Sequence, residues 1–376
     1  MHLLLATLED PYDPKSWSGT AFHMRLALER NFTKVSVLGA QKPRRTLFHA
    51  ILRLVLGKNR YPLWMTSTAL RAYGQRLNQA ISDLQPDAIL CISSQHLIYS
   101  KLGKVPSFMI SDAPWMAYKQ AYSAYDPMPI LANHYARMEA KVARELTAVI
   151  YPTTWACNEA IERFDIPSGK CMQIALGANR FCPHSEETIS ESINQRTLQP
   201  LNLLFIGKDW DRKGGPLALR ITKALNEIGV DANLSIVGCS PELSSDEMQS
   251  TRVIGFLSPD DRNHVQRMEQ AFAQADFLLV PSQAECYGLV FAEAQSYGLP
   301  CLALNVQGIP SVIDHQRSGL LFDPNTNPNI IAREIQALIN EPTRYRSMAE
   351  AARQKYLKDL NWDQFGRKIY AAITSR

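Results

Sequence analysis

The sequence PSQAECYGLVFAEAQSYGLP occupies residues 281–300 of this chain. It follows FLLV at residues 277–280, an apolar run that is typical of a buried strand in a parallel sheet. Gly288 stands where a helix can begin, and residues 289–297 give that helix one apolar side. This order of strand, loop and helix places backbone N–H groups and the positive end of a helix dipole at the carboxyl edge of a sheet. The stretch therefore predicts a site for an anionic ligand.

Two carboxylates, Glu285 and Glu293, bracket the predicted helix start. Beside an anion they would repel it, unless they face its neutral hydroxyl groups. A sugar nucleotide has both parts, because its phosphates suit the N–H groups and its hydroxyls suit the carboxylates. Glutamates at this spacing also occur on the solvated faces of ordinary helices. Their position after a buried strand and around a glycine turn favours the site.

The composition is that of a globular protein with room for two domains. The chain has 376 residues, 46% hydrophobic and 20% charged, and its net charge of +4 is too small to indicate a nucleic-acid partner. Its seven cysteines form no Cys-x-x-Cys pair, which is typical of reduced thiols in a cytoplasmic protein. The apolar run after Met1 predicts a first core strand, not a signal peptide. We see no apolar run near the ~20 residues of a membrane span and expect a soluble protein.

Short aliphatic runs alternate with helix-length segments along the chain, which is the pattern of an α/β protein with doubly wound parallel sheets. The pattern fades in the polar residues 186–199 and starts again at residue 201. We therefore predict an N-terminal domain over residues 1–185, a linker over 186–199, a C-terminal domain over 200–355, and a final helix over 356–376 that packs back towards the first domain.

A turn-rich loop, DPYDPKSWSGT at residues 10–20, follows the first predicted strand. Gly19 stands at its end, where the next helix begins and where a glycine lets the backbone approach a ligand closely. The loop does not contain the Gly-x-Gly-x-x-Gly pattern of a dinucleotide site. A plain turn between strand and helix is the alternative interpretation.

A second unusual loop, GKDWDRKGG at residues 207–215, follows the first strand of the second half. Lys208, Arg212 and Lys213 place three cations at the sheet edge where ligands of α/β proteins bind. Cations there could stabilise a diphosphate leaving group, and a solvated basic turn is the alternative. The loop also contains Asp-Trp-Asp at residues 209–211, a pattern that binds metal in another class of sugar transferases. We interpret it as a chance match, since the neighbouring cations can do the work of a metal.

Together these motifs resemble those of the retaining glycosyltransferases with two Rossmann-like domains that face each other across a cleft (GT-B), specifically glycosyltransferase family 4, the "glycosyl transferases group 1". The resemblance is specific over residues 201–324 and looser before them. It rests on the two glutamates separated by seven residues, on the Gly-Lys and Lys-Gly ends of the basic loop, on IALGAN at residues 174–179, and on the glycine turn at residues 17–20. Residues 318–321 resemble the family's hairpin after the donor site.

The resemblance implies a role for each matched residue. Glu293 would bind the donor ribose, and Glu285 would hold the transferred sugar. Gly19 would meet the diphosphate from the other domain, and the base would lie along residues 253–257. The diphosphate would be bound by three cations and by the backbone of the helix start, that is, by Lys208, Arg212, Lys213, Gly288, Leu289 and Val290.

One departure from the family concerns the strand at residues 107–110. Many relatives carry a histidine after it, whereas this chain has Asp112 there. Asp112 could take over part of that role, so we place it with Glu285 and Lys213 among the candidate catalytic residues. Its alternative role is that of N-cap for a helix that starts near Pro114.

The activity that the resemblance implies is transfer of a hexose from a UDP-, GDP- or ADP-sugar to a glycan, lipid or small-molecule acceptor, as in polysaccharide biosynthesis. We expect retention of configuration, no metal ligands and no cofactor besides the donor. Two alternatives stay open: a protein that binds nucleotide sugars without transferring them, and a nucleotide-sugar epimerase.

The predicted acceptor domain contains a basic amphipathic segment, KPRRTLFHAILRLVLGKNRYPLW, at residues 42–64. Such a helix can lie on an anionic membrane, which would make the protein peripheral on the inner membrane face. The alternative is a helix that packs its apolar side on the domain core and leaves its basic residues in water.

Overall fold

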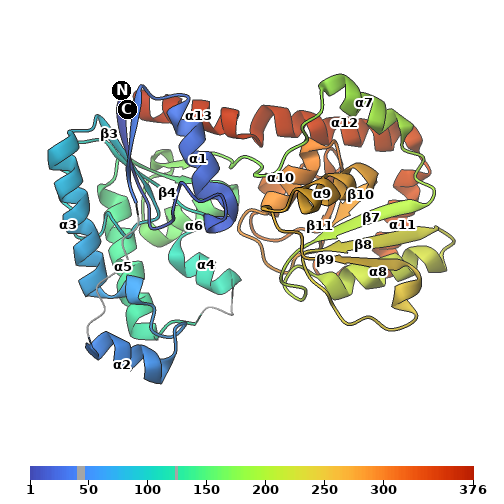
Figure 1. Ribbon diagram of the computed structural model, residues 1–376, viewed down its shortest axis with the longest axis horizontal. Helices are drawn as coiled ribbons and strands as arrows, with labels where there is room; N and C mark the ends of the chain where they lie inside the picture. Colours follow the sequence, from blue (N-terminus) through green and yellow to red (C-terminus); the bar gives the residue numbers. More distant parts are fainter. Residues whose placement is uncertain (40–46, 123–125) are drawn as a thin grey trace. The chain divides into compact units, whose positions relative to one another are not determined.

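The computed structural model describes residues 1–39, 47–122 and 126–376 (Figure 1). The chain divides into two compact units. The first unit contains Met1–Asn179 and Trp362–Arg376, and the second contains Arg180–Asn361. Each unit holds one six-stranded sheet with helices around it, and every strand pairing in both sheets is parallel. The predicted class of two doubly wound parallel-sheet domains is confirmed.

The sheet of the first unit has the order β2-β1-β3-β4-β5-β6. Its strands are β1 (His2–Ala6), β2 (Lys34–Leu38), β3 (Ala88–Ile92), β4 (Ser107–Ile110), β5 (Ala148–Tyr151) and β6 (Cys171–Gln173). Every residue of the central strands β3, β4 and β5 is buried, so both faces of the sheet are covered. The strand order reverses between β1 and β3, and ligands of such sheets bind at this point, beyond the carboxyl ends of the strands.

The helices of the first unit include the last helix of the chain. They are α1 (Thr20–Glu29), α2 (Leu47–Leu56), α3 (Ser67–Leu84), α4 (Trp115–Ala121), α5 (Pro129–Glu145), α6 (Thr154–Phe164) and α13 (Trp362–Thr374). Helix α13 packs against α1, where a Cβ at Gly366 would lie only 2.7 Å from the carbonyl oxygen of Ala27. The Trp362 indole N–H also donates to Asn179 Oδ1 at 3.1 Å. These contacts hold the C-terminal helix in the first unit.

The sheet of the second unit has the order β12-β11-β10-β7-β8-β9, so its order reverses between β7 and β10. Its strands are β7 (Leu201–Ile206), β8 (Ala232–Val237), β9 (Thr251–Gly255), β10 (Phe277–Leu279), β11 (Cys301–Leu304) and β12 (Gly319–Phe322). Its helices are α7 (Glu186–Gln195), α8 (Gly215–Glu227), α9 (Arg262–Gln274), α10 (Leu289–Ser296), α11 (Pro328–Ile339) and α12 (Pro342–Asp359).

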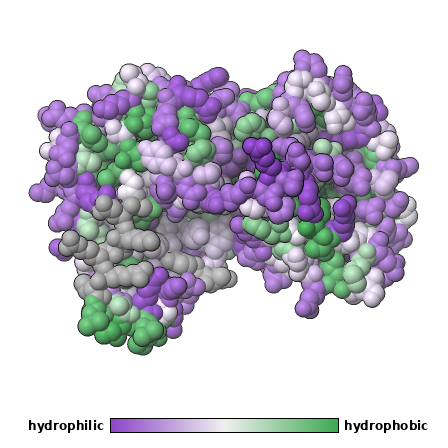
Figure 2. Space-filling model, viewed as in Figure 1, coloured by the Kyte–Doolittle hydropathy of each residue, from purple (hydrophilic) through white to green (hydrophobic). Residues whose placement is uncertain are grey.

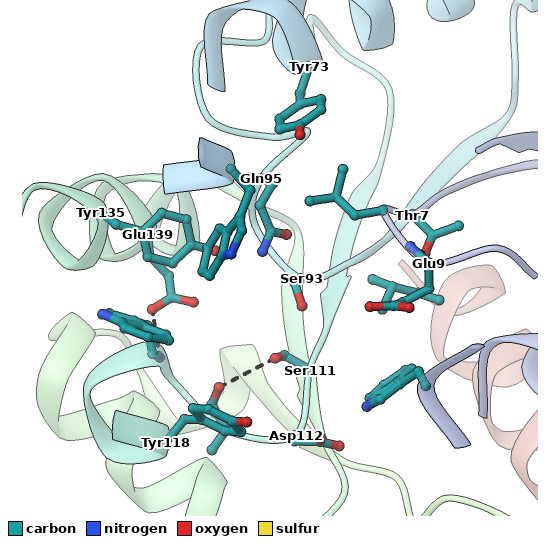
Figure 3. Close-up of a pocket in the computed structure, with 16 residues that line it drawn as sticks. Thr7, Glu9, Tyr73, Ser93, Gln95, Ser111, Asp112, Tyr118, Tyr135 and Glu139 are labelled. Carbon is teal, nitrogen blue, oxygen red and sulfur yellow. Dashed lines mark hydrogen bonds between the residues drawn. The ribbon is translucent and has the colours of Figure 1, made fainter. Parts of the chain in front are cut away.

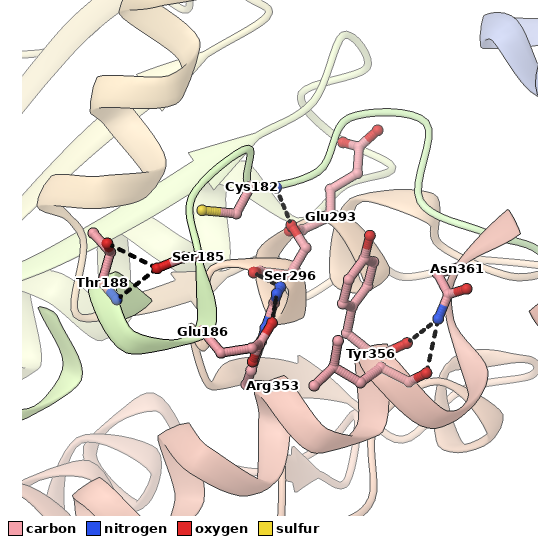
Figure 4. A network of polar contacts seen from close by, with 10 residues as sticks. Cys182, Ser185, Glu186, Thr188, Glu293, Ser296, Arg353, Tyr356 and Asn361 are labelled. Atoms are coloured by element: carbon pink, nitrogen blue, oxygen red, sulfur yellow. Dashed lines mark hydrogen bonds and ion pairs between the residues drawn. The ribbon is translucent and has the colours of Figure 1, made fainter. Parts of the chain in front are cut away.

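The segment that we expected to be a linker, residues 186–199, differs in the structure, because most of it forms α7. This helix buries Ile189 and Ile193 and packs against α12. Figure 4 shows a polar contact that accompanies the packing: Arg353 of α12 donates from Nε to both carboxylate oxygens of Glu186 at 3.1 Å. It also shows the segment before α7 held to α10, where the N–H of Cys182 donates to Ser296 Oγ at 2.9 Å. The second unit therefore begins at Arg180.

Two further boundaries differ from the expected ones. The final helix was expected over residues 356–376, but α12 continues to Asp359 in the second unit and α13 begins at Trp362 in the first. Residues 318–321 do not form a hairpin, because Gly319–Phe322 is strand β12 and pairs in parallel with β11.

Helix α2 lies in the basic amphipathic segment and turns its apolar side to solvent. The exposed fractions are 79% for Leu47, 86% for Leu54 and 74% for Val55, whereas His49 on the other side is buried. The alternative interpretation, in which this apolar side packs on the domain core, is therefore wrong. Figure 2 shows the corresponding apolar patch over α2. The basic residues Lys42, Arg44 and Arg45 lie outside the described residues. None of the helices in the described part of the chain is long and apolar enough to cross a bilayer.

Candidate functional site

The two loops of the predicted donor site meet at the reversal point of the second sheet. The basic loop, residues 207–215, follows β7, and the glutamate loop, residues 281–288, follows β10. These two strands are hydrogen-bonded neighbours, so parallel pairing brings their carboxyl ends together. The N–H of Gln283 donates to the carbonyl oxygen of Arg212 at 2.8 Å and ties one loop to the other.

Gly214 allows this close approach of the loops. Its φ of +79° is in the left-handed region, and a Cβ there would lie 1.9 Å from the carbonyl oxygen of Pro281. A side chain would thus meet both a conformational cost and a backbone clash. Gly214 is also the N-cap of α8, so the basic loop leads directly into a helix start.

Two of the three predicted cations converge on Glu285. Lys213 Nζ forms an ion pair with Glu285 Oε2, and Arg212 Nη1 lies 3.5 Å from the same oxygen. Arg212 Nη1 also donates to the carbonyl oxygen of Ala284 at 3.0 Å. The Lys213 and Glu285 side chains are only 14% and 9% exposed, so water screens this cluster weakly. Its arrangement presents cations beside a carboxylate at one sheet edge.

Glu285 is also held through its backbone, by a residue that the sequence did not indicate. Its N–H donates to Gln307 Oε1 at 2.7 Å, and its carbonyl oxygen accepts from the N–H of Gly308 at 3.1 Å. Gln307 follows the neighbouring strand β11 and has a φ of +43°, a left-handed conformation that is unusual for this residue type. No local sequence pattern marks such a residue.

The start of α10 has the form that the sequence predicts. Gly288 is its N-cap with φ +88° and no side-chain cap bond, and a Cβ there would lie 2.5 Å from Phe291 Cδ2. The following residues, Leu289 and Val290, are half-buried and buried. Without a side-chain cap, the first N–H groups of a helix are suited to an anionic ligand.

Glu293 is buried inside α10, with 5% of the residue exposed. Burial raises the pKa of its carboxyl to about 7, and the nearby charges of Arg180 and Lys213 partly oppose the rise. The backbone N–H of Arg180 donates to Glu293 Oε1 at 3.2 Å. A carboxyl near its pKa at neutral pH can both donate and accept, which suits hydroxyl groups.

Lys208 lies apart from the Glu285 cluster. Its Nζ stands over the ring of Phe256, 5.2 Å from the ring centroid. Phe256 is 55% exposed and Val253 is 39% exposed, so the segment that we expect to line the base presents an apolar surface. Binding of the diphosphate by Lys208 stays a prediction.

The Asp-Trp-Asp pattern serves the fold of the basic loop. Asp209 accepts hydrogen bonds from the backbone N–H of Arg212 at 3.1 Å and from its Nε at 3.3 Å. Over residues 1–39, 47–122 and 126–376, no group of three or more His, Cys, Asp or Glu side chains is arranged to hold a metal ion.

The glycine loop of the first unit has an unusual backbone. Trp17, Ser18 and Gly19 are all left-handed, with φ of 47°, 57° and 89°. Asn179 holds the loop, since its Nδ2 donates to the carbonyl oxygen of Ser18 at 2.8 Å and to Thr20 Oγ1 at 3.1 Å. Left-handed non-glycine residues persist only where their surroundings enforce them, and they gather at functional sites.

Asp112 lines a pocket of 510 Å³ in the first unit, which we call the aromatic pocket (Figure 3). It lies beyond the carboxyl ends of β1, β3 and β4, at the reversal point of the first sheet. Helix α4 begins at Trp115 with Pro114 as N-cap, and the N–H of Trp115 donates to Glu139 Oε2 at 2.9 Å. The alternative role of Asp112 as N-cap is therefore wrong. The sequence did not indicate Glu139 or the other pocket residues.

Comparison with known proteins bears on both units. The family model of the glycosyl transferases group 1 matches residues 187–355, which include the basic loop and both glutamates. Residues 187–355 belong to this family. The seven-residue spacing of Glu285 and Glu293 and the ends of the basic loop thus lie within a group 1 glycosyltransferase domain.

Relatives extend the similarity beyond this domain. A D-inositol 3-phosphate glycosyltransferase of Corynebacterium aurimucosum is 27% identical over 230 residues, 57% of this chain and 53% of the relative. An N-acetyl-alpha-D-glucosaminyl L-malate synthase of Bacillus anthracis is 33% identical over 129 residues, 33% of this chain and 32% of the relative. The chain spans about half the length of the first of these and a third of the second. HepE of Anabaena, solved in complex with UDP, has the same fold, with a TM-score of 0.66 and 16% identity over all of both chains.

Proposed function

We propose that the protein is a retaining, metal-independent glycosyltransferase that transfers a hexose from a UDP-, GDP- or ADP-sugar to a glycan, lipid or small-molecule acceptor. The observation that carries the proposal is the cluster at Glu285, where Lys213 and Arg212 pair with a carboxylate that stands in the loop just before α10, a helix whose N-cap Gly288 makes no side-chain cap bond. The relatives are named for sugar transfer, and HepE was solved with UDP. Both support a nucleotide-sugar donor.

The cluster supports a division of roles. Lys213, Arg212 and the N–H groups after Gly288 would hold the diphosphate and stabilise the charge that develops as the bond to the anomeric carbon breaks. Glu285 would accept hydrogen bonds from the hexose, and Glu293 from the ribose. The acceptor oxygen would form the new bond to the anomeric carbon, and its proton would pass to the leaving diphosphate.

Two features favour cations over a metal in this role. The ammonium group of Lys213 and the guanidinium group of Arg212 already pair with Glu285 in the loop before α10, and Asp209 is engaged by Arg212. The Asp-Trp-Asp pattern therefore has a structural use that needs no ion.

The test is a thermal-shift panel of UDP-, GDP- and ADP-hexoses on the wild type and on Glu293→Ala. We expect one nucleotide family to raise the Tm of the wild type and to have a smaller effect on the variant. No shift with any of the three would contradict the proposal. Product analysis then separates the alternatives: an epimerase changes the sugar without an acceptor, and a binding protein leaves the donor intact.

We also propose that α2 makes a peripheral contact with an anionic membrane on its inner, cytoplasmic face. Its apolar side is exposed, and Arg53, Lys58 and Arg60 follow the apolar residues closely. An apolar face beside basic side chains complements an anionic lipid surface. All seven cysteines are free thiols, which suits the reducing cytoplasm.

Flotation with vesicles rich in phosphatidylglycerol tests the contact. We expect the wild type to float with these vesicles and Leu54→Glu to bind about tenfold less, because burial of a leucine contributes about 1.5–3 kcal/mol. Ile130→Glu, at a position 71% exposed on α5, is the matched control. Absence of the wild type from the vesicle fraction would contradict the contact.

A further inference from the structure

We propose that the aromatic pocket of the first unit binds an uncharged saccharide ring as the acceptor of the reaction. The inference rests on the proposed function and adds the chemical class of the acceptor. The pocket lies entirely within the first unit, and its 510 Å³ fall in the range of about 300–1,000 Å³ that small-molecule sites occupy.

Aromatic side chains form most of the apolar wall. They come from four separate segments and are Trp17, Trp64, Tyr73, Trp115, Tyr118 and Tyr135. Trp64 contacts Trp115 and Tyr135 edge to face, with centroids 5.8 and 5.2 Å apart, and Trp115 stacks on Tyr118 at 6.0 Å. Rings that brace one another are rigid, and they present flat apolar faces that match the C–H faces of a sugar. Among the described lining residues, Leu8, Ile92 and Ala113 add the aliphatic surface.

The polar part of the lining consists of hydroxyl, amide and carboxyl groups. Gln95 Oε1 is buried without a hydrogen-bond partner, and Figure 3 shows the Gln95 amide among the side chains that line the pocket. A buried, unpaired carbonyl oxygen is costly and calls for a donor. Ser93, Ser111 and Asp112 are further polar groups of the lining. A ligand with several hydroxyl groups can donate to Gln95 Oε1 and still pair with the other polar groups, because each hydroxyl both donates and accepts.

Glu139 is a buried polar group of the same lining. It is 3% exposed, and its Oε2 accepts from the Trp115 N–H. Behind it, Ser94 Oγ and the Tyr135 hydroxyl are 2.7 Å apart, which fixes the surroundings of the carboxyl. Burial raises the pKa of Glu139 to about 8, so the group is largely protonated at neutral pH. A protonated carboxyl favours a hydroxyl over an amine as its partner.

The charges of the lining exclude phosphorylated acceptors. Glu9 and Asp112 carry carboxylates, Glu139 adds a neutral carboxyl, and among the described residues that line the pocket there is no lysine or arginine. A phosphate in this space would lose its hydration and face like charges without a counter-ion. An uncharged sugar avoids this penalty.

Ligand-observed saturation-transfer NMR, with tryptophan fluorescence as a second readout, tests the proposal. The probes are the methyl α-glycosides of glucose, mannose and galactose, together with myo-inositol, glucosamine and glucose 6-phosphate. We expect saturable binding of at least one uncharged probe, and binding of glucose 6-phosphate at least about tenfold weaker than that of methyl α-glucoside. Tighter binding of the phosphate or of glucosamine, or no binding of any uncharged probe, overturns the proposal.

Variants place the binding in this pocket. Gln95→Ala should lower the affinity for the uncharged probe at least fivefold. The control Gln195→Ala, which changes an exposed glutamine of the second unit, should leave this affinity unchanged. Asp112→Asn should raise the affinity for glucose 6-phosphate relative to that for methyl α-glucoside at least threefold. A variant that is merely destabilised would not show such a change of preference. Equal probe affinities in all three variants and the wild type overturn the assignment.

The donor thermal shift, measured on the same samples, separates the two claims. Gln95→Ala should leave the donor shift intact, because Gln95 belongs to the first unit and every residue of the Glu285 cluster belongs to the second. A donor shift without sugar binding would overturn the acceptor class alone. Sugar binding without any donor shift would overturn the proposed function.

Discussion

Replacement of Lys213 by alanine removes the ammonium group that pairs with Glu285 next to the start of α10. In the ligand-free protein the charge of Lys213 is already compensated by Glu285. When a diphosphate binds, Lys213 exchanges one anion for another, so the net contribution to donor affinity is small. We expect the Kd of the donor to rise only about three- to fivefold, a change of about 1 kcal/mol.

The transition state is different, because the leaving diphosphate gains about one further negative charge that has no partner in the ground state. One unit charge about 4 Å away contributes about 4 kcal/mol at an effective dielectric constant of about 20. Loss of one oxyanion donor in enzymes costs about 2.7–4 kcal/mol. The kcat of Lys213→Ala should therefore fall about 100- to 1,000-fold.

Steady-state turnover and donor titration calorimetry measure these two effects separately. Lys213→Arg keeps the charge and should recover part of kcat. Lys223→Ala, an exposed lysine of α8 that pairs with Asp246, should leave both constants unchanged. If Lys213→Ala weakens donor binding more than tenfold and leaves kcat within threefold of the wild type, Lys213 acts in ground-state binding and the assigned role is wrong.

Three further predictions concern the second unit. Gly214→Ala should lower the free energy of unfolding by more than about 3 kcal/mol, because its Cβ would clash with Pro281. The control Gly229→Ala, at a glycine with φ +87° and open space around its Cβ, should cost about 1 kcal/mol in the same thermal unfolding experiment. Equal losses of stability in the two variants would show that the loops move apart freely. Burial raises the pKa of Glu293 to about 7. Between about pH 4.5 and 7 the folded state therefore binds more protons than the unfolded state. As the pH rises through this window, ionisation of Glu293 lowers the free energy of unfolding. The change in the free energy of unfolding caused by Glu293→Gln should therefore be about 3 kcal/mol more favourable at pH 8 than at pH 5. A change that is the same at both pH values would refute the titration of a buried Glu293. EDTA should change the transfer rate by less than about twofold; a tenfold loss that Mg²⁺ restores would assign the Asp-Trp-Asp pattern to a metal after all.

The residues of the donor site were accessible from sequence because each lies in a local pattern. Glu285 and Gly288 follow a buried strand, and Lys213 lies in a loop after another strand. The ion pair of Glu285 and Lys213 was not predicted, because it joins residues 72 positions apart and depends on the adjacency of β7 and β10. Strand order is a long-range property that local spacing does not contain.

Other parts of the structure had no local signal. The Arg180 contact with Glu293 uses a backbone N–H, which every residue type except proline would supply. The aromatic pocket is assembled from separate segments, and each of its rings would pass for an ordinary core residue in isolation. Amphipathic patterns identify an apolar side but not what covers it. For this reason the sequence left two interpretations of α2 open, and the buried Ile189 and Ile193 of α7 differed from the expected linker.

The release of nucleoside diphosphate from UDP-, GDP- and ADP-hexoses tests the central claim most directly. The reaction contains a methyl glycoside acceptor and is followed by chromatography for the wild type, for Glu285→Gln and for the exposed control Glu227→Gln. We predict release from one donor by the wild type and the control, and at least a hundredfold slower release by Glu285→Gln. No release from any donor, or equal release by Glu285→Gln, would contradict the assignment of the Glu285 cluster as a sugar-transfer site.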